Sequence, residues 1–287
     1  MISVIIPAYE KEDRVYNCLR SVCDQEYADL EILIVYRPGN DKTRDEIKRI
    51  QDPRIRIIEQ TKKTGPGGAR NIGIRESRGE YLGFVDCDDF IPPDFYRLLY
   101  DAIVANKADI AFGEMVAPRA RGWKTLSQHN KDTCLSNFFD KYSRIKNGAA
   151  FDKLYRTDLI KQAGLYFQEG IFYEDNCWIL SVFYHLKKLI LVKGAVYQYT
   201  LSEKNADQKA ALARDLLPAI DSMLLFCKAK AFDSRECRLV KKKILTTFAG
   251  GFINNVEDAK KFISILGMNF YIPYILAKNI TRKMLFS

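Results

Sequence analysis

The sequence lacks the features that mark membrane-spanning and secreted proteins. Its longest late apolar run, "MNFYIPYILA", is 10 residues long, whereas a helix that crosses a bilayer needs about 20. The opening stretch "MISVIIPAYEKED" has no basic residue before its apolar run, so it predicts a first strand and not a signal peptide. The seven cysteines show no CxxC or Cys/His spacing, and we therefore expect a cytoplasmic protein with reduced thiols.

Net charge is nearly absent from the first two thirds of the chain. Residues 1–200 hold 30 Lys and Arg against 28 Asp and Glu, whereas residues 201–287 hold 15 against 8. A basic region of this kind suits an anionic lipid surface or nucleic acid, and it is also compatible with a solvated helix face. Because no nucleic-acid-binding motif accompanies the charge, we expect no nucleic-acid partner.

Apolar runs and helical patterns alternate along the first half of the chain. The runs predict five strands, at residues 3–7, 30–35, 54–59, 81–85 and 108–112. Alternation of strands and helices implies an α/β fold with a mostly parallel central sheet flanked by helices. Ligands of such sheets lie beyond the carboxyl ends of the strands.

The second half of the chain is less regular. No pattern predicts structure for residues 113–150, but a helix fits "TDLIKQA", ended by Gly164 as a left-handed cap, and another fits 174–186. "LILV" and "AVYQYT" predict late strands, and the remaining pattern is helical. We therefore predict an α/β domain over residues 1–205 and a helical C-terminal region over 206–287.

Three carboxylates follow the strand predicted in "GEYLGFVDCDDF". Asp86 and Asp88 form a D-x-D pair, and Asp89 comes directly after it. Such a pair can hold a divalent ion through its oxygens and leave positions open for water and substrate phosphates. An ion in this place would offset the charge of a diphosphate leaving group. Asp88 or Asp89 could instead cap the turn that leads to the next helix.

Three longer stretches contain or accompany these carboxylates, namely "VIIPAYEKEDRVYNCLRSVCDQ", "TGPGGARNIGIRESRGEYLGFVDCDDF" and "KLYRTDLIKQAGLYFQEGIFYEDNCW". In this order and at this spacing, the sequence resembles the family 2 inverting glycosyltransferases of the bacterial surface-glycan type, which have the GT-A nucleotide-sugar-binding fold. The resemblance covers residues 1 to about 200. No single motif is specific for the family, but the three stretches together are. The last third of the chain contributes no motif to it.

The resemblance implies a metal-dependent glycosyltransferase of the hexosyltransferase type. Such an enzyme moves a sugar from a nucleotide diphosphate donor, usually a UDP-sugar, to a hydroxyl of a glycan or lipid-linked acceptor, with inversion at the anomeric carbon. The implied cofactor is a divalent metal, Mn²⁺ or Mg²⁺. The implied pathway is polysaccharide biosynthesis for the cell envelope.

The resemblance also assigns donor-binding residues. Pro7, Ala8 and Tyr9 match the family's first loop, which lines the nucleoside pocket. Arg70 matches the arginine of the A-R-N segment, which lies near the donor. Tyr9 could instead serve only in ordinary packing, and Arg70 could be a surface ion-pair partner. The glycines around "GPGGARN" lack both the G-K-[ST] of a P-loop and the G-x-G-x-x-G of a Rossmann turn.

The remaining assignments concern carboxylates. Asp86 and Asp88 match the family's D-x-D, which holds the metal and the donor diphosphate, and Asp89 matches a further acidic position. Asp175 matches the aspartate of the E-D pair, the general base that takes the proton from the acceptor hydroxyl. A sugar hydroxyl is a poor nucleophile until a base removes its proton, so a carboxylate suits this role. Asp175 could also be a charge that complements a helix dipole.

The chain departs from the family at the end of the second strand. The family has D-D-G-S-T-D there, and the early acidic residues of that motif bind the nucleoside. This sequence has "YRPGND" instead, from Tyr36 and Arg37 to Asn40 and Asp41. A carboxylate there would contribute on the order of 1.5–3 kcal/mol as a charge-assisted bond. Tyr36 could stack on a base, and Arg37 could favour a phosphate. The chain is therefore either an enzyme with an altered donor pocket or a non-catalytic binding module, and the retained acidic residues favour an enzyme.

The basic C-terminal region suggests two partners besides donor and acceptor. It could contact the anionic inner face of the cell membrane from the cytoplasm, and its helices could form a homodimer. Acceptor specificity is expected to depend on residues 113–150 and on the same C-terminal helices.

Overall fold

A computed structural model of the chain describes residues 1–119, 122–144, 148–200 and 206–252. The chain divides into two compact units, Met1–Glu203 and Lys204–Ser287, and each is described by itself. Within the described residues, no helix combines the length and the apolar character that crossing a bilayer would require.

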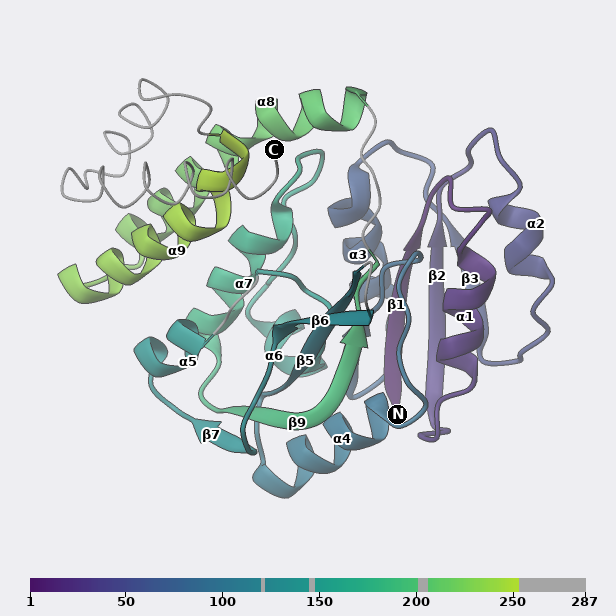
Figure 1. The fold of residues 1–287 in the computed structure, drawn as a ribbon, viewed down its shortest axis with the longest axis horizontal. Helices are drawn as coiled ribbons and strands as arrows, with labels where there is room; N and C mark the ends of the chain where they lie inside the picture. The colour runs from purple at the N-terminus through teal and green to yellow at the C-terminus, as the bar shows by residue number, and fades with distance from the viewer. Residues whose placement is uncertain (120–121, 145–147, 201–205, 253–287) are drawn as a thin grey trace. The chain divides into compact units, whose positions relative to one another are not determined.

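The first unit is built on one sheet, which has nine strands in the described part of the chain (Figure 1). The strand order is β3-β2-β1-β4-β8-β5-β9-β7, and β6 pairs with β5 outside this path. The strands are β1 (Ile2–Ala8), β2 (Leu30–Tyr36), β3 (Ile55–Glu59), β4 (Tyr81–Phe84), β5 (Ile110–Arg119), β6 (Gly122–Ser127), β7 (Thr133–Leu135), β8 (Lys153–Arg156) and β9 (Leu189–Gln198).

The predicted α/β fold is confirmed, and the sheet is mixed. Strands β1 to β4 form parallel pairs, as do β5 and β9. Strand β8 lies between β4 and β5 and is antiparallel to both. Residues 113–150, for which no pattern was found, contain the end of β5 as well as β6, β7 and a short helix. Strand β6 is exposed at most of its positions, so its sequence lacks the alternation that identifies a half-buried strand.

Helices cover both faces of this sheet. Alternate residues of β1 face opposite sides: Ile2 and Ile6 share a core with α1 and α4, whereas Ile5 lies against Gly73 of α3. The helices of this unit are α1 (Val15–Cys23), α2 (Thr43–Lys48), α3 (Gly65–Glu76), α4 (Phe95–Asn106), α5 (Phe138–Arg144), α6 (Thr157–Gln162) and α7 (Glu174–His185). Gly164, just after α6, is left-handed at φ 63°, as predicted.

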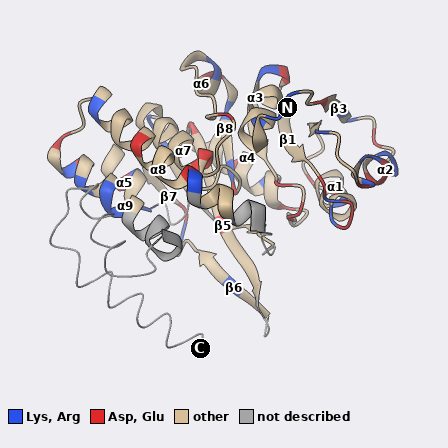
Figure 2. Ribbon diagram, turned by 90° about the horizontal axis from the view of Figure 1, so that it is seen from above, with Lys and Arg blue, Asp and Glu red and all other residues tan. Residues whose placement is uncertain are grey.

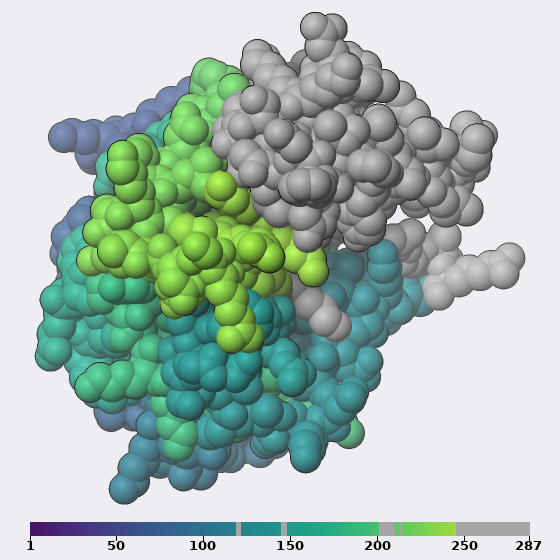
Figure 3. Space-filling model, turned by 90° about the vertical axis from the view of Figure 1, so that its left-hand side faces the viewer, coloured from purple at the N-terminus to yellow at the C-terminus, as the bar shows by residue number. Residues whose placement is uncertain are grey.

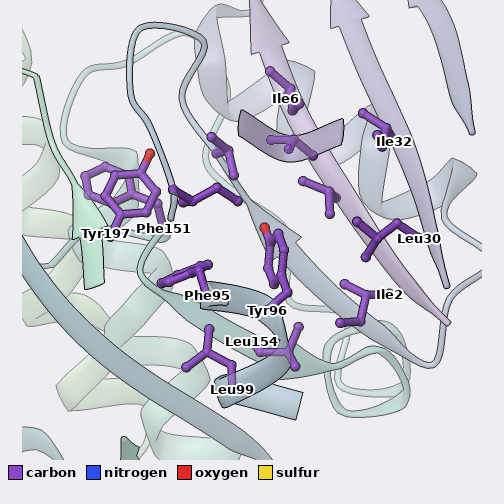
Figure 4. Packing of buried hydrophobic residues seen from close by; sticks show 14 of the residues in the cluster. Ile2, Ile6, Leu30, Ile32, Phe95, Tyr96, Leu99, Phe151, Leu154 and Tyr197 are labelled. Atoms are coloured by element: carbon purple, nitrogen blue, oxygen red, sulfur yellow. The ribbon is translucent and has the colours of Figure 1, made fainter. Parts of the chain in front are cut away.

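Buried apolar side chains fix the sheet against these helices. In Figure 4, Ile2 and Ile6 from β1 and Leu30 and Ile32 from β2 belong to one buried cluster with Tyr96 of α4. Each fully buried side chain of this size contributes about 1.5–3 kcal/mol relative to exposure. Because parallel strands of this kind are buried on both faces, their sequences are continuous apolar runs.

Parallel pairing brings several strand ends to one edge of the sheet. Ala8 at the end of β1 pairs with Tyr36 at the end of β2, and Ile5 pairs with Phe84 at the end of β4. The loops that follow β1, β2 and β4 therefore leave the sheet at the same edge. This is the edge at which ligands of α/β sheets bind.

The second unit is helical where it is described. It contains α8 (Ala206–Ala229) and α9 (Ser234–Phe252), which contact each other and form the green to yellow surface in Figure 3. Val240 and Ile244 of α9 are fully buried. Lys241, Lys242 and Lys243 belong to the same helix, which also carries Glu236, and α2 in the first unit likewise carries both signs of charge (Figure 2).

Candidate active site

Helix α3 begins with glycines that allow close packing. A Cβ on Gly67 would lie 2.7 Å from the carbonyl oxygen of Gln168, and one on Gly68 would lie 1.9 Å from Oγ1 of Thr64. Both distances are shorter than real carbon contacts, so only glycine fits. Gly67 therefore lets the first turn of α3 pack against the segment before α7, and Gly68 lets the same turn approach Thr64.

Arg70, in the next turn of α3, joins three carboxylates from two other parts of the chain. Its Nη1 donates to Oε1 of Glu174 at 2.7 Å and to Oδ1 of Asp175 at 3.0 Å, and its Nη2 donates to Oδ1 of Asp86 at 2.7 Å. The side chain is only 3% exposed. The alternative that Arg70 is a surface ion-pair partner is therefore wrong.

The charge of Arg70 is secured by these neighbours. Burial alone would favour the neutral form, but the carboxylates of Asp175, Asp86 and Glu174 raise the pKa of Arg70 well above its ordinary value. Its Nε is buried without a hydrogen-bond partner among the described residues. One permanent cation thus holds the end of β4 and the start of α7 together.

Asn71, the neighbour of Arg70, fixes the segment that leads into α7. Its amide donates to the carbonyl oxygen of Phe167 at 2.9 Å and to Oε1 of Glu169 at 3.1 Å, and its Oδ1 accepts from the Phe167 N–H at 2.7 Å. This residue was missed in the sequence, although it belongs to the A-R-N segment. It places the acidic start of α7 next to Arg70.

Glu174 and Asp175 differ in exposure, although they are adjacent. Glu174 is 6% exposed, and burial together with the charge of Asp175 raises the pKa of Glu174 to about 8, against the opposing effect of Arg70. Asp175 is 18% exposed, and its Oδ2 accepts from the Ala150 N–H at 3.4 Å. A ligand can therefore reach Asp175 more readily than Glu174.

The three carboxylates after β4 lie in different surroundings. Asp86 is 28% exposed and bonded to Arg70, and Oδ2 of Asp88 pairs with Nζ of Lys11 at 2.8 Å. Asp89 is fully buried and accepts from the Tyr197 hydroxyl and the Thr200 N–H, both at 2.7 Å. Asp89 thus ties the loop after β4 to the end of β9.

These surroundings change the proton affinities of two of the carboxylates. Burial and the charge of Asp86 raise the pKa of Asp89 to about 8. Burial also raises the pKa of Asp86, opposed by Arg70 and reinforced by Asp175 and Asp88. Repulsion of this kind among Asp86, Asp88 and Asp175 is what a bound cation relieves.

The chemistry of Asp86 and Asp88 fits a divalent cation that also binds substrate. Within the described part of the chain, no three or more His, Cys, Asp or Glu residues form a group that could hold a metal ion. Two carboxylates can still serve a cation whose other oxygen ligands come from phosphates and water. Lys11, a residue missed in the sequence, already pairs with Asp88 at this place.

The first loop and the end of β2 lie side by side. Pro7 and Ala8 are the last residues of β1, and the exposed Tyr9 follows them. The guanidinium carbon of Arg37 lies 3.8 Å from the centre of the Tyr9 ring. Tyr36 is 4% exposed within β2, so the expectation that it could stack on a base is wrong.

Asp41, the acidic residue retained after β2, forms hydrogen bonds with its own loop and with the loop after β1. It accepts from the Thr43 hydroxyl at 2.6 Å and from the Glu12 N–H at 3.2 Å. The resemblance predicts acidic side chains at positions 36 and 37, where this chain has the buried Tyr36 and Arg37, the latter stacked on Tyr9.

The family-model comparison agrees with this fold and site. Residues 3–164, more than half of the chain, match the family model described as "Glycosyl transferase family 2". The chain belongs to glycosyltransferase family 2.

Curated relatives include bacterial glycosyltransferases. The glycosyltransferase GlyA of Streptococcus pneumoniae is 30% identical over 214 residues, which are 70% of this chain and 30% of GlyA. The poly(ribitol-phosphate) beta-N-acetylglucosaminyltransferase TarS of Staphylococcus aureus is 24% identical over 216 residues, 73% of this chain and 37% of TarS. The aligned part is thus about a third of the length of each of these two relatives.

Solved structures show the same fold. The crystal structure of S. aureus TarS 1–349 in complex with UDP-GlcNAc has a TM-score of 0.77 at 17% identity, and covers 98% of this chain and 88% of that one. The mannosyltransferase PcManGT from Pyrobaculum calidifontis, in complex with GDP-Man and Mn²⁺, has a TM-score of 0.56 at 15% identity, with 97% and 86% covered. The fold is therefore GT-A, as the sequence predicted.

Proposed function

We propose that this chain is an inverting glycosyltransferase that moves a sugar from a nucleotide diphosphate donor, a UDP-sugar, to a hydroxyl of a surface glycan or lipid-linked acceptor. The observation that carries the proposal is the Arg70 cluster. It brings Asp86, at the ligand-binding edge of the sheet, and Asp175, at the start of α7, onto one guanidinium. A leaving-group site and a proton acceptor are thereby held at one place.

Asp175 would act as the general base. Its carboxylate takes the proton of the acceptor hydroxyl while the hydroxyl oxygen forms the new bond to the anomeric carbon. The bond from that carbon to the donor phosphate breaks at the same time, and its electron pair leaves with the diphosphate. Arg70 holds Oδ1 of Asp175 at 3.0 Å and so limits rotation of the carboxylate.

Asp86 and Asp88 would hold the divalent cation, Mn²⁺ or Mg²⁺. When bound, such a cation stabilises the negative charge of the departing diphosphate. The Mn²⁺ named with PcManGT supports this assignment. Lys11, paired with Asp88 at 2.8 Å, places a second positive charge near the same phosphates.

The names of the relatives support the substrate classes. UDP-GlcNAc is bound in the TarS structure, and the relatives include poly(ribitol-phosphate) glycosyltransferases and a succinoglycan biosynthesis protein. Pro7, Ala8 and Tyr9 would contact the nucleoside, with Arg37 stacked on Tyr9 in place of an acidic pair. We place the enzyme in the cytoplasm, with peripheral contact to the inner face of the membrane through its basic C-terminal region. A homodimer through that region stays a prediction.

A donor panel tests the proposal. UDP-glucose, UDP-galactose, UDP-GlcNAc and GDP-mannose are incubated with the protein and Mn²⁺, Mg²⁺ or a chelator, and release of nucleoside diphosphate is measured. We expect slow release from at least one UDP-sugar, and loss of release with the chelator. Absence of both release and binding heat for every donor would instead support a degenerate, non-catalytic module.

Replacement of the base separates turnover from binding. In Asp175→Asn we expect turnover to fall by at least about 100-fold, because the acceptor proton has no carboxylate to receive it. The Kd of the donor, measured by calorimetry, should stay within about twofold, since the diphosphate side of the site is retained. Asp13→Asn, an exposed residue of the loop before α1, is the matched control and should retain turnover.

A further inference from the structure

The segment 149–152, just before β8, contacts Asp175 through a backbone N–H. Ala150 N–H donates to Oδ2 of Asp175 at 3.4 Å, while Oδ1 of the same carboxylate accepts from Arg70 at 3.0 Å. The two oxygens of Asp175 therefore have partners on different elements. Since rotation of the carboxylate would break one of these bonds, the position of the Ala150 peptide helps to orient Asp175.

Two side chains of β8 form hydrogen bonds with the backbone carbonyls of this segment. Nζ of Lys153 donates to the carbonyl oxygen of Ala149 at 2.8 Å and to that of Phe151 at 3.3 Å. The hydroxyl of Tyr155 donates to the carbonyl oxygen of Ala150 at 2.7 Å. Three successive carbonyls are thus bound, and the N–H of Ala150 is directed towards Asp175.

The burial of Lys153 is unusual for a residue that only supports a strand. Lys153 and Asp152 form an ion pair in which both side chains are fully buried. Nζ of Lys153 also lies 4.1 Å from the centre of the Phe112 ring. Two buried charges rarely stabilise a fold more than apolar residues of similar size would. A lysine at this position is better explained by its three N–H donors, which bind the carbonyls of Ala149 and Phe151 and the carboxylate of Asp152.

The backbone of the segment is strained as well as clamped. Asp152 has φ 62°, a left-handed conformation that a residue with a side chain adopts at a cost. Its carbonyl oxygen accepts from Gly113 N–H of β5 at 2.8 Å. A Cβ on Gly113 would lie 2.4 Å from the carbonyl oxygen of Ala195, so this close approach also requires glycine.

The same segment contacts the other half of the site. The ring of Phe151 stacks on Tyr197 with 4.5 Å between ring centres and an angle of 17°, as Figure 4 shows. The Tyr197 hydroxyl donates to Asp89 and accepts from the Asp86 N–H at 3.1 Å. The segment is therefore joined to the loop that carries Asp86 through the ring of Phe151, whereas Lys153 and Tyr155 bind the carbonyls of the segment.

We propose that Lys153 is a positioning residue for the proton acceptor. Its ammonium group holds the carbonyls on both sides of Ala150 and thereby keeps the Ala150 N–H on Oδ2 of Asp175. The inference rests on the proposed role of Asp175 as the base. Lys153 touches neither donor nor acceptor, so its removal should reduce the rate of the chemical step and leave donor binding unchanged.

The test uses two variants that release the segment in different ways. Asp152→Asn combined with Lys153→Met removes the clamp without leaving a buried unpaired charge. Tyr155→Phe removes only the hydroxyl that binds the Ala150 carbonyl. Turnover is measured as UDP released from the UDP-sugar that the wild-type protein uses, and binding is measured by calorimetry with UDP and Mn²⁺ as the probe.

We expect kcat to fall about tenfold or more in the double variant and about threefold in Tyr155→Phe, because small displacements of a catalytic group have effects of this size. The KM of the donor and the Kd of UDP should change by less than about twofold in both. A merely structural role for Lys153 would lower the fraction of folded protein and not produce this split.

Lys141→Met is the matched control. Lys141 is also a buried lysine, and it donates to a backbone carbonyl, that of Leu186 after the far end of α7. We expect this variant to retain the kcat of the wild type below its melting temperature. An unchanged kcat in both clamp variants, or an equal loss in Lys141→Met, would overturn the inference while leaving the proposed function intact. An inactive wild-type protein would overturn both.

Discussion

Arg70 carries one positive charge and binds three carboxylates. This cluster is stable because not all three carboxylates ionise freely. Burial and neighbouring charges raise the pKa values of Asp86 and Glu174. Removing the guanidinium would leave these acids in a buried place without a counter-charge. The cluster is therefore as important for the stability of the first unit as for the proposed chemistry.

For Arg70→Met we expect the free energy of unfolding of the first unit to fall by about 3–5 kcal/mol, the usual cost of breaking a buried ion pair. Urea unfolding followed by fluorescence measures this loss. Arg56→Met is the control, because Arg56 also pairs with two carboxylates but is 31% exposed, and it should cost no more than about 1 kcal/mol. Equal losses in the two variants would show that burial of Arg70 is unimportant.

Glu174 should make stability depend on pH. Its pKa is about 8 in the folded protein, against about 4.5 in the unfolded chain. Between these values the folded state binds a proton that the unfolded state has lost. The resulting stability is fully present below about pH 4.5, and it is lost as the pH rises towards about 8.

Glu174→Gln cannot titrate and should lack this contribution. We expect the melting temperature of the wild type, relative to the variant, to decrease from about pH 5 to about pH 8. Differential scanning fluorimetry across this range measures the difference. Glu26→Gln, in which a half-exposed carboxylate is lost, controls for the change in net charge. A constant difference between wild type and Glu174→Gln would contradict the assignment.

Residues of the site that follow a strand or start a helix were predictable from the sequence. The residues that hold them in place were not. Asp86 follows an apolar run, and Asp175 starts a helical pattern, so both are recognisable from neighbouring residues. Lys153 binds the carbonyls of nearby residues and the side chain of Asp152, and nothing in "DKLY" shows that the lysine is buried. The partners of Arg70 are 104 and 105 positions away in α7, a separation at which sequence spacing carries no geometric information.

At the scale of the elements, the parallel half of the sheet was predictable because its strands are continuous apolar runs. Strand β8 is only four residues long, and its antiparallel entry between β4 and β5 brings Lys153 beneath the site. A segment this short shows no distinct period. The order of β8, β5 and β9 therefore came from tertiary packing alone.

Helix α3 depends on a glycine where it crosses β1. A Cβ on Gly73 would lie 2.3 Å from Cγ2 of Ile5 and 2.9 Å from its Cγ1. For Gly73→Ala we expect a loss of about 1–3 kcal/mol in the free energy of unfolding, since overpacking a buried contact displaces the helix or the strand. Displacement of α3 would also move Arg70, so turnover should fall together with stability.

A double-variant cycle with Ile5→Ala checks the cause. If the methyl groups of Ile5 create the clash, Gly73→Ala should cost less in the Ile5→Ala background than in the wild type. Arg75→Ala, on the exposed side of α3, should change stability by less than about 0.5 kcal/mol. Additive losses from Gly73→Ala and Ile5→Ala would rule out the contact as the reason for the glycine.

At the scale of the whole molecule, charge distinguishes the two parts of the sequence. The excess of seven positive charges in residues 201–287 suits an anionic membrane, where each lysine near the surface contributes about 1 kcal/mol. Lys241→Gln combined with Lys242→Gln should therefore weaken binding to vesicles of phosphatidylcholine and phosphatidylglycerol about 30-fold. Sedimentation with the vesicles measures the bound fraction.

Lys62→Gln combined with Lys63→Gln removes the same charge from an exposed loop of the first unit and is the matched control. It should bind vesicles nearly as well as the wild type. Binding should also weaken as salt is added, because added ions screen the attraction. Equal binding of the wild type to neutral and anionic vesicles would remove the membrane proposal.

The shared guanidinium of Arg70 has a consequence for the two ends of the reaction. Asp86 accepts from Nη2 and Asp175 accepts from Nη1 of this guanidinium, so a displacement of Arg70 would change both hydrogen bonds together. Under the proposed function, a donor that shifts Arg70 on binding near Asp86 would therefore also reposition Asp175, the proposed base.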